Sequence, residues 1–272
     1  MVYQPHAWSD RLSTRPGAPF AVRASERFLA RHTDVLVANC EDELRRGRDI
    51  GVRAAGHSLG VAVDLTRFRP PTHAERYAAR ELLGLPGDRR VALVLGRLTR
   101  QKGQDLLLPA WVAAPPPNTT LALVGPGDPA PLAQLAGGET GRSVIMPGGT
   151  AEVLPWLWAA DVMVLSSRYE TVSLVIAEAM STGLPVVATA VDGAEEVLQA
   201  GPEEPAGAVV PLDDMAVLMR ELTRRLDDPA LHARESAGGP VRARARFAPQ
   251  EVARLLEAAY RDAIQRHHSE QR

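Results

Sequence analysis

Short apolar runs recur along the chain from residue 91 onward and alternate with longer segments of helical periodicity. The runs are rich in valine and leucine and lack a clear alternation of polar and apolar positions. That pattern is typical of strands buried on both faces of a parallel sheet. The runs, each predicted to be a strand, cover residues 91–95, 121–124, 144–146, 162–165, 185–188 and 208–210.

The segments between these runs are long enough to form crossover helices. They cover residues 101–114, 151–160, 173–182, 194–200 and 213–226. Alternating strands and helices predict an α/β fold, here a Rossmann-like, doubly wound domain over about residues 76–247. In such sheets ligands bind beyond the carboxyl ends of the strands, so functional residues are expected in the loops that follow the strands.

Residues 1–75 contain fewer elements of the same kind. Strands are predicted at residues 2–4, 35–38 and 59–63, with a helix over 20–32. Three parallel strands are few for an independent domain. We therefore expect a partial, Rossmann-like N-terminal lobe on the acceptor side, lacking its front, with the Pro70-Pro71 pair at the boundary between the lobes.

The last segment, residues 248–272, has the pattern of an amphipathic helix. Its apolar positions fall at i, i+3, i+4, i+7 and i+11, and they are Val252, Leu255, Leu256, Ala259 and Ala263. Such a stripe must bury itself against another element. We expect this helix to pack back toward the N-terminal lobe.

Composition limits the class of protein further. The 272 residues are 45% hydrophobic and 24% charged, with a formal net charge of -2, which excludes disordered, collagen-like and coiled-coil proteins. A charge so close to zero gives no overall attraction to nucleic acid, and no such partner is expected. Cys40 is the single cysteine, and no stretch approaches the ~20 apolar residues that span a bilayer. A cytoplasmic protein is expected.

The loop after the strand at 91–95 carries the first candidates for chemistry: Gly96, Arg97 and Lys102. Two cations beside glycines and a helix N-terminus suit a polyanion such as a diphosphate. Of the 31 basic residues, Lys102 is the single lysine, a compact point charge that can reach a phosphate oxygen where a planar guanidinium fits less well. The alternative is a solvated loop in which both charges are incidental.

A second group of candidates follows the fourth of these strands. Glu170 is expected in the loop, Ser173 as the N-cap of the next helix, and Glu178 within that helix. Eight residues of helix span about 12 Å, which suits two carboxylates that grip the two ends of one ligand. Free N–H groups at Ser173, Leu174 and Val175 would hold a phosphate between them. The alternative is a loop acid and an exposed helix residue.

The motifs stand in an order that resembles the family 4 glycosyltransferases of the GT-B fold. They are GRLTRQKG from Gly96, LVGPGDP around Gly125, the pair Glu170-x7-Glu178, and the following AEAMSTGLPVVAT. The resemblance covers about residues 3–260. It implies a retaining, metal-independent enzyme that moves a sugar from a UDP- or GDP-linked donor to an acceptor, with no cofactor.

The resemblance also implies roles for individual residues. Arg97 and Lys102 would hold the donor diphosphate, Glu170 would face the hydroxyls of the donor sugar, and Glu178 would bind the ribose hydroxyls. His6 would lie near the transferred sugar. The implied donor-binding set is Gly96, Arg97, Lys102, Gly125, Gly148, Glu170, Ser173, Leu174, Val175 and Glu178, and the implied catalytic set is Glu170, His6, Arg97 and Lys102.

The sequence departs from the family pattern at two places. Thr171 stands where the family often has glycine after the first glutamate, and its Cβ narrows the loop that would contact the donor sugar. Val61-Ala62 stands where the family often has Asn-Gly.

Other functions remain open at this point. A degenerate relative would bind the nucleotide sugar without turnover. A nicotinamide-dependent oxidoreductase fits the architecture, but the glycines around Gly125 lack the third glycine of a dinucleotide fingerprint. The acceptor could be a sugar, a lipid or a small molecule. Arg23, Arg27 and Arg31 form a stripe that could touch an anionic membrane at its inner face, or simply be a solvated helix face.

Overall fold

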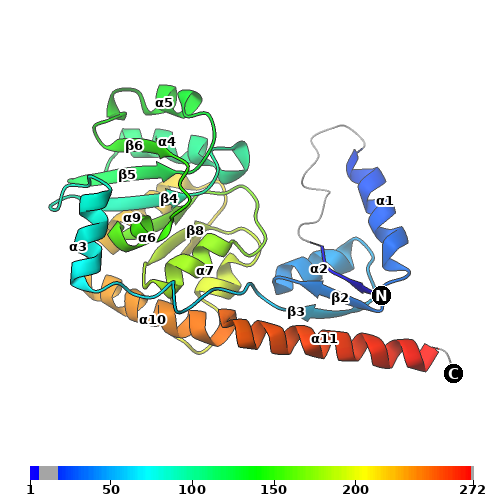
Figure 1. Ribbon diagram of the computed structural model, residues 1–272. Coiled ribbons are helices and arrows are strands. Elements are labelled where there is room, and N and C mark those ends of the chain that lie inside the picture. The colour runs from blue at the N-terminus through cyan, green and yellow to red at the C-terminus, as the bar shows by residue number, and fades with distance from the viewer. Residues whose placement is uncertain (6–17, 271–272) are drawn as a thin grey trace.

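The computed structural model describes residues 1–5 and 18–270, arranged in two lobes (Figure 1). The larger lobe is built on a parallel sheet whose strands stand in the order β6-β5-β4-β7-β8-β9. The strands are β4 (Arg90–Leu95), β5 (Thr119–Val124), β6 (Val144–Gly148), β7 (Val162–Leu165), β8 (Val186–Thr189) and β9 (Gly207–Val210). The prediction of a Rossmann-like parallel sheet is confirmed. The chain runs outward from β4 to β6 and then returns to β7, so the strand order switches between β4 and β7.

Helices cover both faces of this sheet, because its central strands are apolar on both sides. One face carries α4 (Gln104–Ala113), α5 (Ala130–Ala136) and α9 (Met215–Asp227), with Trp111, Leu132 and Leu218 buried against the strands. The other carries α3 (His73–Leu82), α6 (Leu154–Ala159), α7 (Leu174–Ser181), α8 (Ala194–Leu198) and α10 (Pro229–Phe247).

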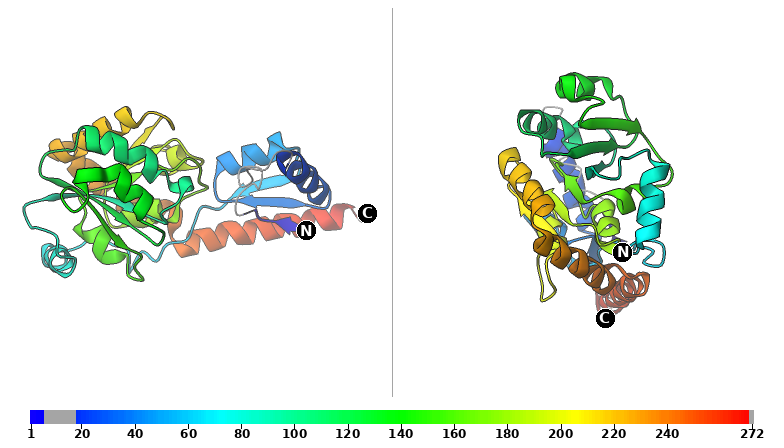
Figure 2. Two further views of the ribbon diagram at one scale, coloured as in Figure 1. Left: turned by 90° about the horizontal axis from the view of Figure 1, so that it is seen from above. Right: turned by 90° about the vertical axis from the view of Figure 1, so that its left-hand side faces the viewer.

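The smaller lobe has a three-stranded parallel sheet in the order β1-β2-β3. Its elements are β1 (Val2–Tyr3), α1 (Ala18–Ala30), β2 (Val35–Ala38), α2 (Glu41–Asp49) and β3 (Ala55–Ser58). Helix α11 (Pro249–Glu270) lies along this lobe in Figure 1 and in the left view of Figure 2. Ala259 and Ala263 of α11 pack against Val35 and Val37 of β2, so the apolar stripe of the last helix covers one face of the small sheet.

The third small-lobe strand was predicted at the wrong residues. It is Ala55–Ser58, and residues 59–63 form a loop between the lobes. Leu59 and Val63 are apolar because they are buried in the packing of that loop, at 4% and 3% exposure. A Cβ at Gly56 of β3 would lie 2.9 Å from the Leu44 side chain. Helix α2 can therefore pack against β3 at this position only because the strand residue there has no side chain.

Helices α2, α3, α5 and α10 were not predicted, and α10 shows why. Its sequence contains Gly238-Gly239-Pro240, which on local propensity argues against a helix. A Cβ at Gly239 would lie 2.7 Å from the Met180 carbonyl oxygen of α7. The glycines therefore allow two helices to approach closely, a reason that exists only in the folded chain.

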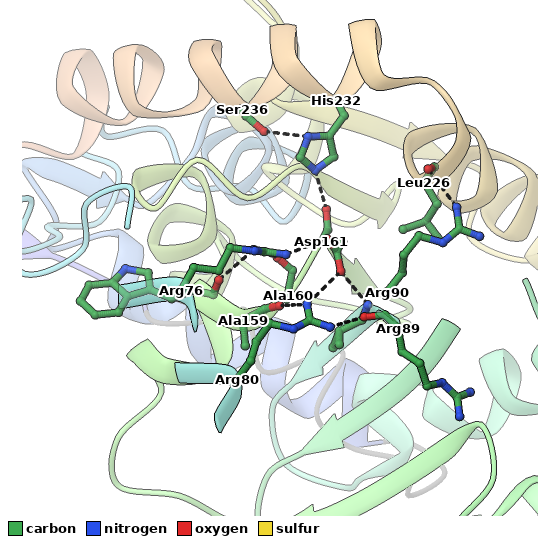
Figure 3. Close-up of polar contacts among 12 residues, drawn as sticks. Arg76, Arg80, Arg89, Arg90, Ala159, Ala160, Asp161, Leu226, His232 and Ser236 are labelled. Carbon is green, nitrogen blue, oxygen red and sulfur yellow. Dashed lines mark hydrogen bonds and ion pairs between the residues drawn. The ribbon is translucent and has the colours of Figure 1, made fainter. Parts of the chain in front are cut away.

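A polar cluster at the amino ends of β4 and β7 holds α3 in place (Figure 3). Asp161 accepts from Arg76 at 2.7 Å through one carboxylate oxygen and from the Val91 backbone N–H at 2.7 Å through the other. Arg80 lies 3.6 Å from the second oxygen, and His232 of α10 contacts the Asp161 carbonyl at 3.0 Å. Both oxygens of this carboxylate are thus bonded by the protein itself.

Within the described residues, no helix combines the length and the apolar character needed to cross a membrane.

Candidate functional site

The glycine-bearing loops meet at the carboxyl ends of β4, β5 and β6. The N–H of Gly96 donates to Val124 at 2.9 Å, and the N–H of Gly125 donates to Gly148 at 2.9 Å. A Cβ at Gly125 would lie 2.0 Å from the Gly96 carbonyl oxygen, so no other residue fits there without moving the backbone. Backbone hydrogen bonds therefore bring the three predicted donor-binding glycines together at this edge of the sheet.

The loops after β4 and β7 are bonded together, although 68 positions separate them. The N–H of Arg168 donates to the Gln101 carbonyl at 2.8 Å, and its guanidinium donates to the Arg100 carbonyl at 2.7 Å. The same guanidinium forms a two-pronged ion pair with Asp105 at 2.7 and 2.8 Å. This pair lowers the pKa of the Asp105 carboxyl. The switch point between β4 and β7 is thus braced by backbone and side chain together.

Lys102 and Glu170, each predicted for the site from a different loop, contact one another directly. Lys102 Nζ donates to Glu170 Oε1 at 2.6 Å, and Ser167 Oγ donates to the same oxygen at 2.9 Å. Their side chains are only 14% and 10% exposed. Among the described residues nothing bonds to the second oxygen of Glu170. The pair therefore presents an ammonium with N–H groups to spare beside a carboxylate with a free oxygen.

The loop backbone fixes where Lys102 stands. Lys102 closes a 3₁₀ turn, Arg100–Lys102, and Gly103 follows it with φ +68°. A Cβ at Gly103 would lie 1.9 Å from the Ser166 carbonyl oxygen, and Ser166 Oγ donates to the Lys102 carbonyl at 3.0 Å. The lysine is held against the β7 loop by its own backbone.

Arg97, the other predicted cation, is not brought into this contact. Its side chain is exposed, and its one described polar contact is with Gln101 Oε1 at 3.5 Å. Its guanidinium is free to swing toward a ligand at the loop.

The start of α7 differs in one respect from the prediction. Ser173 is the N-cap, but its side chain makes no capping hydrogen bond. Leu174 is 48% exposed, and the first N–H groups of an α-helix have no acceptor within the helix. These donors, including that of Val175, therefore remain available to a ligand.

Glu178 lies in the second turn of α7 as a half-buried carboxylate. Burial raises its pKa to about 7, opposed weakly by the positive charge of Arg67. No described side chain donates a hydrogen bond to it. A carboxylate in this position gains most from hydroxyl groups brought by a ligand.

The large lobe meets the small lobe beside this site. Val172, next to Ser173, belongs to the same buried cluster as Cys40 at the end of β2. Arg46 of α2 pairs with both oxygens of Asp192, with bonds of 2.7 to 3.1 Å. The N–H of Gly193 donates to Asp42 at 2.8 Å.

The residues of this contact were missed from the sequence. Asp192 and Gly193 follow β8, and every loop after a strand of a parallel sheet reaches the same edge. That rule could have found them. His6 lies outside the described residues.

The structure describes no group of three or more histidine, cysteine, aspartate or glutamate side chains placed to hold a metal ion, within residues 1–5 and 18–270.

The fold and the site together define a two-lobed protein of the GT-B type, with ligand loops at the carboxyl edge of a Rossmann-like sheet. Residues 89–228 match the family described as "Glycosyl transferases group 1". The chain belongs to this family, which confirms the family predicted from the motifs.

Individual relatives differ in what their names say they act on. The chain is 35% identical over 268 residues to D-inositol 3-phosphate glycosyltransferase 1 of Catenulispora acidiphila, covering 91% of this chain and 62% of that protein. It is 28% identical to the lipopolysaccharide core biosynthesis mannosyltransferase LpsB of Rhizobium meliloti, covering 86% and 67%. The chain thus spans about three fifths to two thirds of these relatives' length.

A solved structure supports the same fold. Sucrose-phosphate synthase from Thermosynechococcus elongatus superposes with a TM-score of 0.82 at 26% identity, over 97% of this chain and 68% of that one.

Proposed function

We propose that this protein transfers a sugar from a nucleotide diphosphate sugar, UDP- or GDP-linked, to an acceptor with retention of anomeric configuration. The observation that carries the proposal is the contact of Lys102 with Glu170 beside the free start of α7. It pairs an ammonium with a carboxylate, and that carboxylate lies four residues before the start of α7. A diphosphate and the sugar attached to it require those groups.

Each group would act on a different part of the donor. Lys102, the N–H groups of Leu174 and Val175, and the exposed Arg97 would stabilise negative charge on the departing diphosphate. The free oxygen of Glu170 would accept hydroxyls of the donor sugar and orient it. Glu178 would accept the two ribose hydroxyls, which supply the donors that it lacks in the protein.

This assignment needs no metal ion to balance the diphosphate, because two cations and a helix N-terminus supply positive charge. Calorimetry with UDP, GDP and NAD, with and without EDTA, tests it. Binding of UDP or GDP that survives the chelator is expected. Binding that disappears with EDTA contradicts the metal-free assignment, and a preference for NAD would support an oxidoreductase.

For the acceptor we propose only a chemical class. The names of the relatives span an inositol phosphate glycosyltransferase and a lipopolysaccharide mannosyltransferase, so a sugar, a small polyol phosphate or a lipid-linked sugar all fit.

The second candidate is a relative that binds the nucleotide sugar without turning it over. It is favoured by Thr171, whose Cβ narrows the loop that would contact the donor sugar. Measuring transfer and donor hydrolysis for this chain beside a version extended at its N-terminus separates the two. Equal turnover supports the enzyme, whereas donor binding with turnover only in the longer version supports the binding protein.

A further inference from the structure

A strongly positive hollow lies in the small lobe, away from the loops described above. Its volume is about 700 Å³, within the range of small-molecule sites. Four arginines line it: Arg27 from α1, Arg31 from the turn that follows α1, Arg53 before β3, and Arg266 from α11. The segments come together because α11 covers the small sheet.

Two of these arginines are held in position. Arg27 Nε donates to the Ile50 carbonyl at 2.6 Å, and a Cβ at Gly51 would lie 3.2 Å from that nitrogen. Arg266 Nε donates to Asp262 at 2.7 Å. Both bonds use the Nε–H, and the terminal nitrogens of these two guanidiniums donate to no other described residue. The two guanidinium groups are therefore held in position, and their terminal N–H groups can still donate to a ligand.

The other two arginines carry unbalanced charge. The side chains of Arg31 and Arg53 are exposed and bond to no described residue. Among the described residues Asp34, which pairs with the Met1 ammonium, is the carboxylate that lines the hollow, and Asp262 bonds to Arg266 beside it. Four guanidiniums thus face two carboxylates, which leaves an excess of positive charge. Like charges gathered around one space repel each other, and an anion that binds between them relieves the repulsion.

We infer that this hollow is an anion-binding site for a ligand that carries phosphate groups. Arginine forks match the geometry of phosphate oxygens and bind them through paired hydrogen bonds. The hollow is separate from the proposed donor site. Its lining residues lie around the starts of β2 and β3 and near the end of α11. The small lobe meets the large lobe through residues that follow β2.

Hydrogen exchange of the whole chain with and without pyrophosphate tests the inference, because it reports the two sites separately. Protection of peptides covering residues 27–34 and 51–55 is expected. The double variant Arg31→Ala/Arg53→Ala should weaken pyrophosphate binding there at least tenfold, because it removes two of the four guanidiniums that line the hollow. The double variant Arg254→Ala/Arg261→Ala removes the same charge from exposed positions of α11 outside the hollow and should keep the protection.

Two sources of phosphate are then separated with vesicles of phosphatidylglycerol and of phosphatidylcholine. Protection by free pyrophosphate assigns a soluble ligand. Protection only by the phosphatidylglycerol vesicles, and lost in Arg31→Ala/Arg53→Ala, assigns a lipid headgroup. Absence of protection with either probe, equal protection in both double variants, or the same effect from chloride at equal ionic strength overturns the inference.

Discussion

The two ends of the large sheet differ in how a carboxylate is hydrogen-bonded. At the amino end, Asp161 has both oxygens bonded, to Arg76 and to the Val91 N–H. At the carboxyl end, Glu178 is half-buried with no described donor, and burial raises its pKa to about 7. A buried carboxylate is costly unless something pairs with it. At the amino end the protein supplies that partner, whereas at the carboxyl end no described side chain does, and under the proposed function the ribose hydroxyls would.

The same contrast holds for the cations. Arg76 and Arg80 use their guanidiniums on carbonyls and on Asp161, whereas Lys102 makes one bond and keeps other N–H groups. The comparison therefore predicts that changes at the amino end alter stability, and that changes at the carboxyl end alter binding.

The largest effect is expected from Asp161→Ala. The substitution leaves Arg76 Nη2 and the Val91 N–H without their acceptor and removes the carboxylate beside Arg80. It should lower the free energy of unfolding by about 2–4 kcal/mol. Urea denaturation measures this. Asp227→Ala is the matched control, because Asp227 pairs with Arg90 at an exposed position and should cost about 1 kcal/mol or less. Equal losses for the two variants would remove the contrast between buried and exposed carboxylates.

Lys102→Ala should leave the fold intact and act on binding. One charge-assisted bond to diphosphate contributes about 1.5–3 kcal/mol, so the affinity for UDP or GDP should fall roughly 10- to 150-fold. The affinity for the free nucleoside should barely change, because it has no diphosphate. Calorimetry with both ligands gives the comparison. A similar loss for nucleoside and nucleotide means that the substitution damaged the fold.

The raised pKa of Glu178 makes nucleotide binding depend on pH. With a pKa of about 7, the ionised form that accepts ribose hydroxyls becomes about tenfold more populated between pH 6 and pH 8. Affinity should rise by up to that factor. The phosphates titrate in this range too, so the control is Glu178→Gln, which should lose the part of the slope due to Glu178. Identical slopes in both proteins would contradict the assignment.

The same shift has a consequence for stability. The carboxyl pKa is raised above its ordinary value of 4.5 in the folded protein. Its contribution to the free energy of unfolding is therefore fully present below about pH 4.5 and is lost as the pH rises through about 7. Unfolding curves of the wild type and Glu178→Gln should diverge over this interval. Parallel curves would show that burial does not perturb this group.

The smallest effects are expected from substitutions of the two glutamates, and they should differ between the bare nucleotide and the sugar-bearing donor. At pH 8, Glu178→Gln should weaken binding of the bare nucleotide about fivefold, the equivalent of about 1 kcal/mol. Glu170→Gln should leave the bare nucleotide nearly unaffected and weaken only the sugar-bearing donor. Titrating each variant with UDP and UDP-glucose, or with GDP and GDP-mannose, measures both. The reverse pattern would exchange the two roles.

Much of the large lobe was predictable because its information is local. The valine- and leucine-rich runs predict β4 to β9 within a few residues, since a strand buried on both faces needs such side chains wherever it lies. Elements whose sequence is explained by contact with another element were not predictable. The glycines of α10 meet α7, and Gly56 of β3 makes room for α2.

The candidate site, too, was predictable in part from the sequence. The sequence alone determined which residues follow the strands, and so which side chains can reach the carboxyl edge: Gly96, Lys102, Gly125, Glu170 and Glu178 are readable from position and motif order. Only the tertiary structure decided that Lys102 pairs with Glu170, that Arg97 stays apart, and that no described side chain donates to Glu178. The physical reason is the strand order, which places β4 beside β7 and joins loops 68 positions apart.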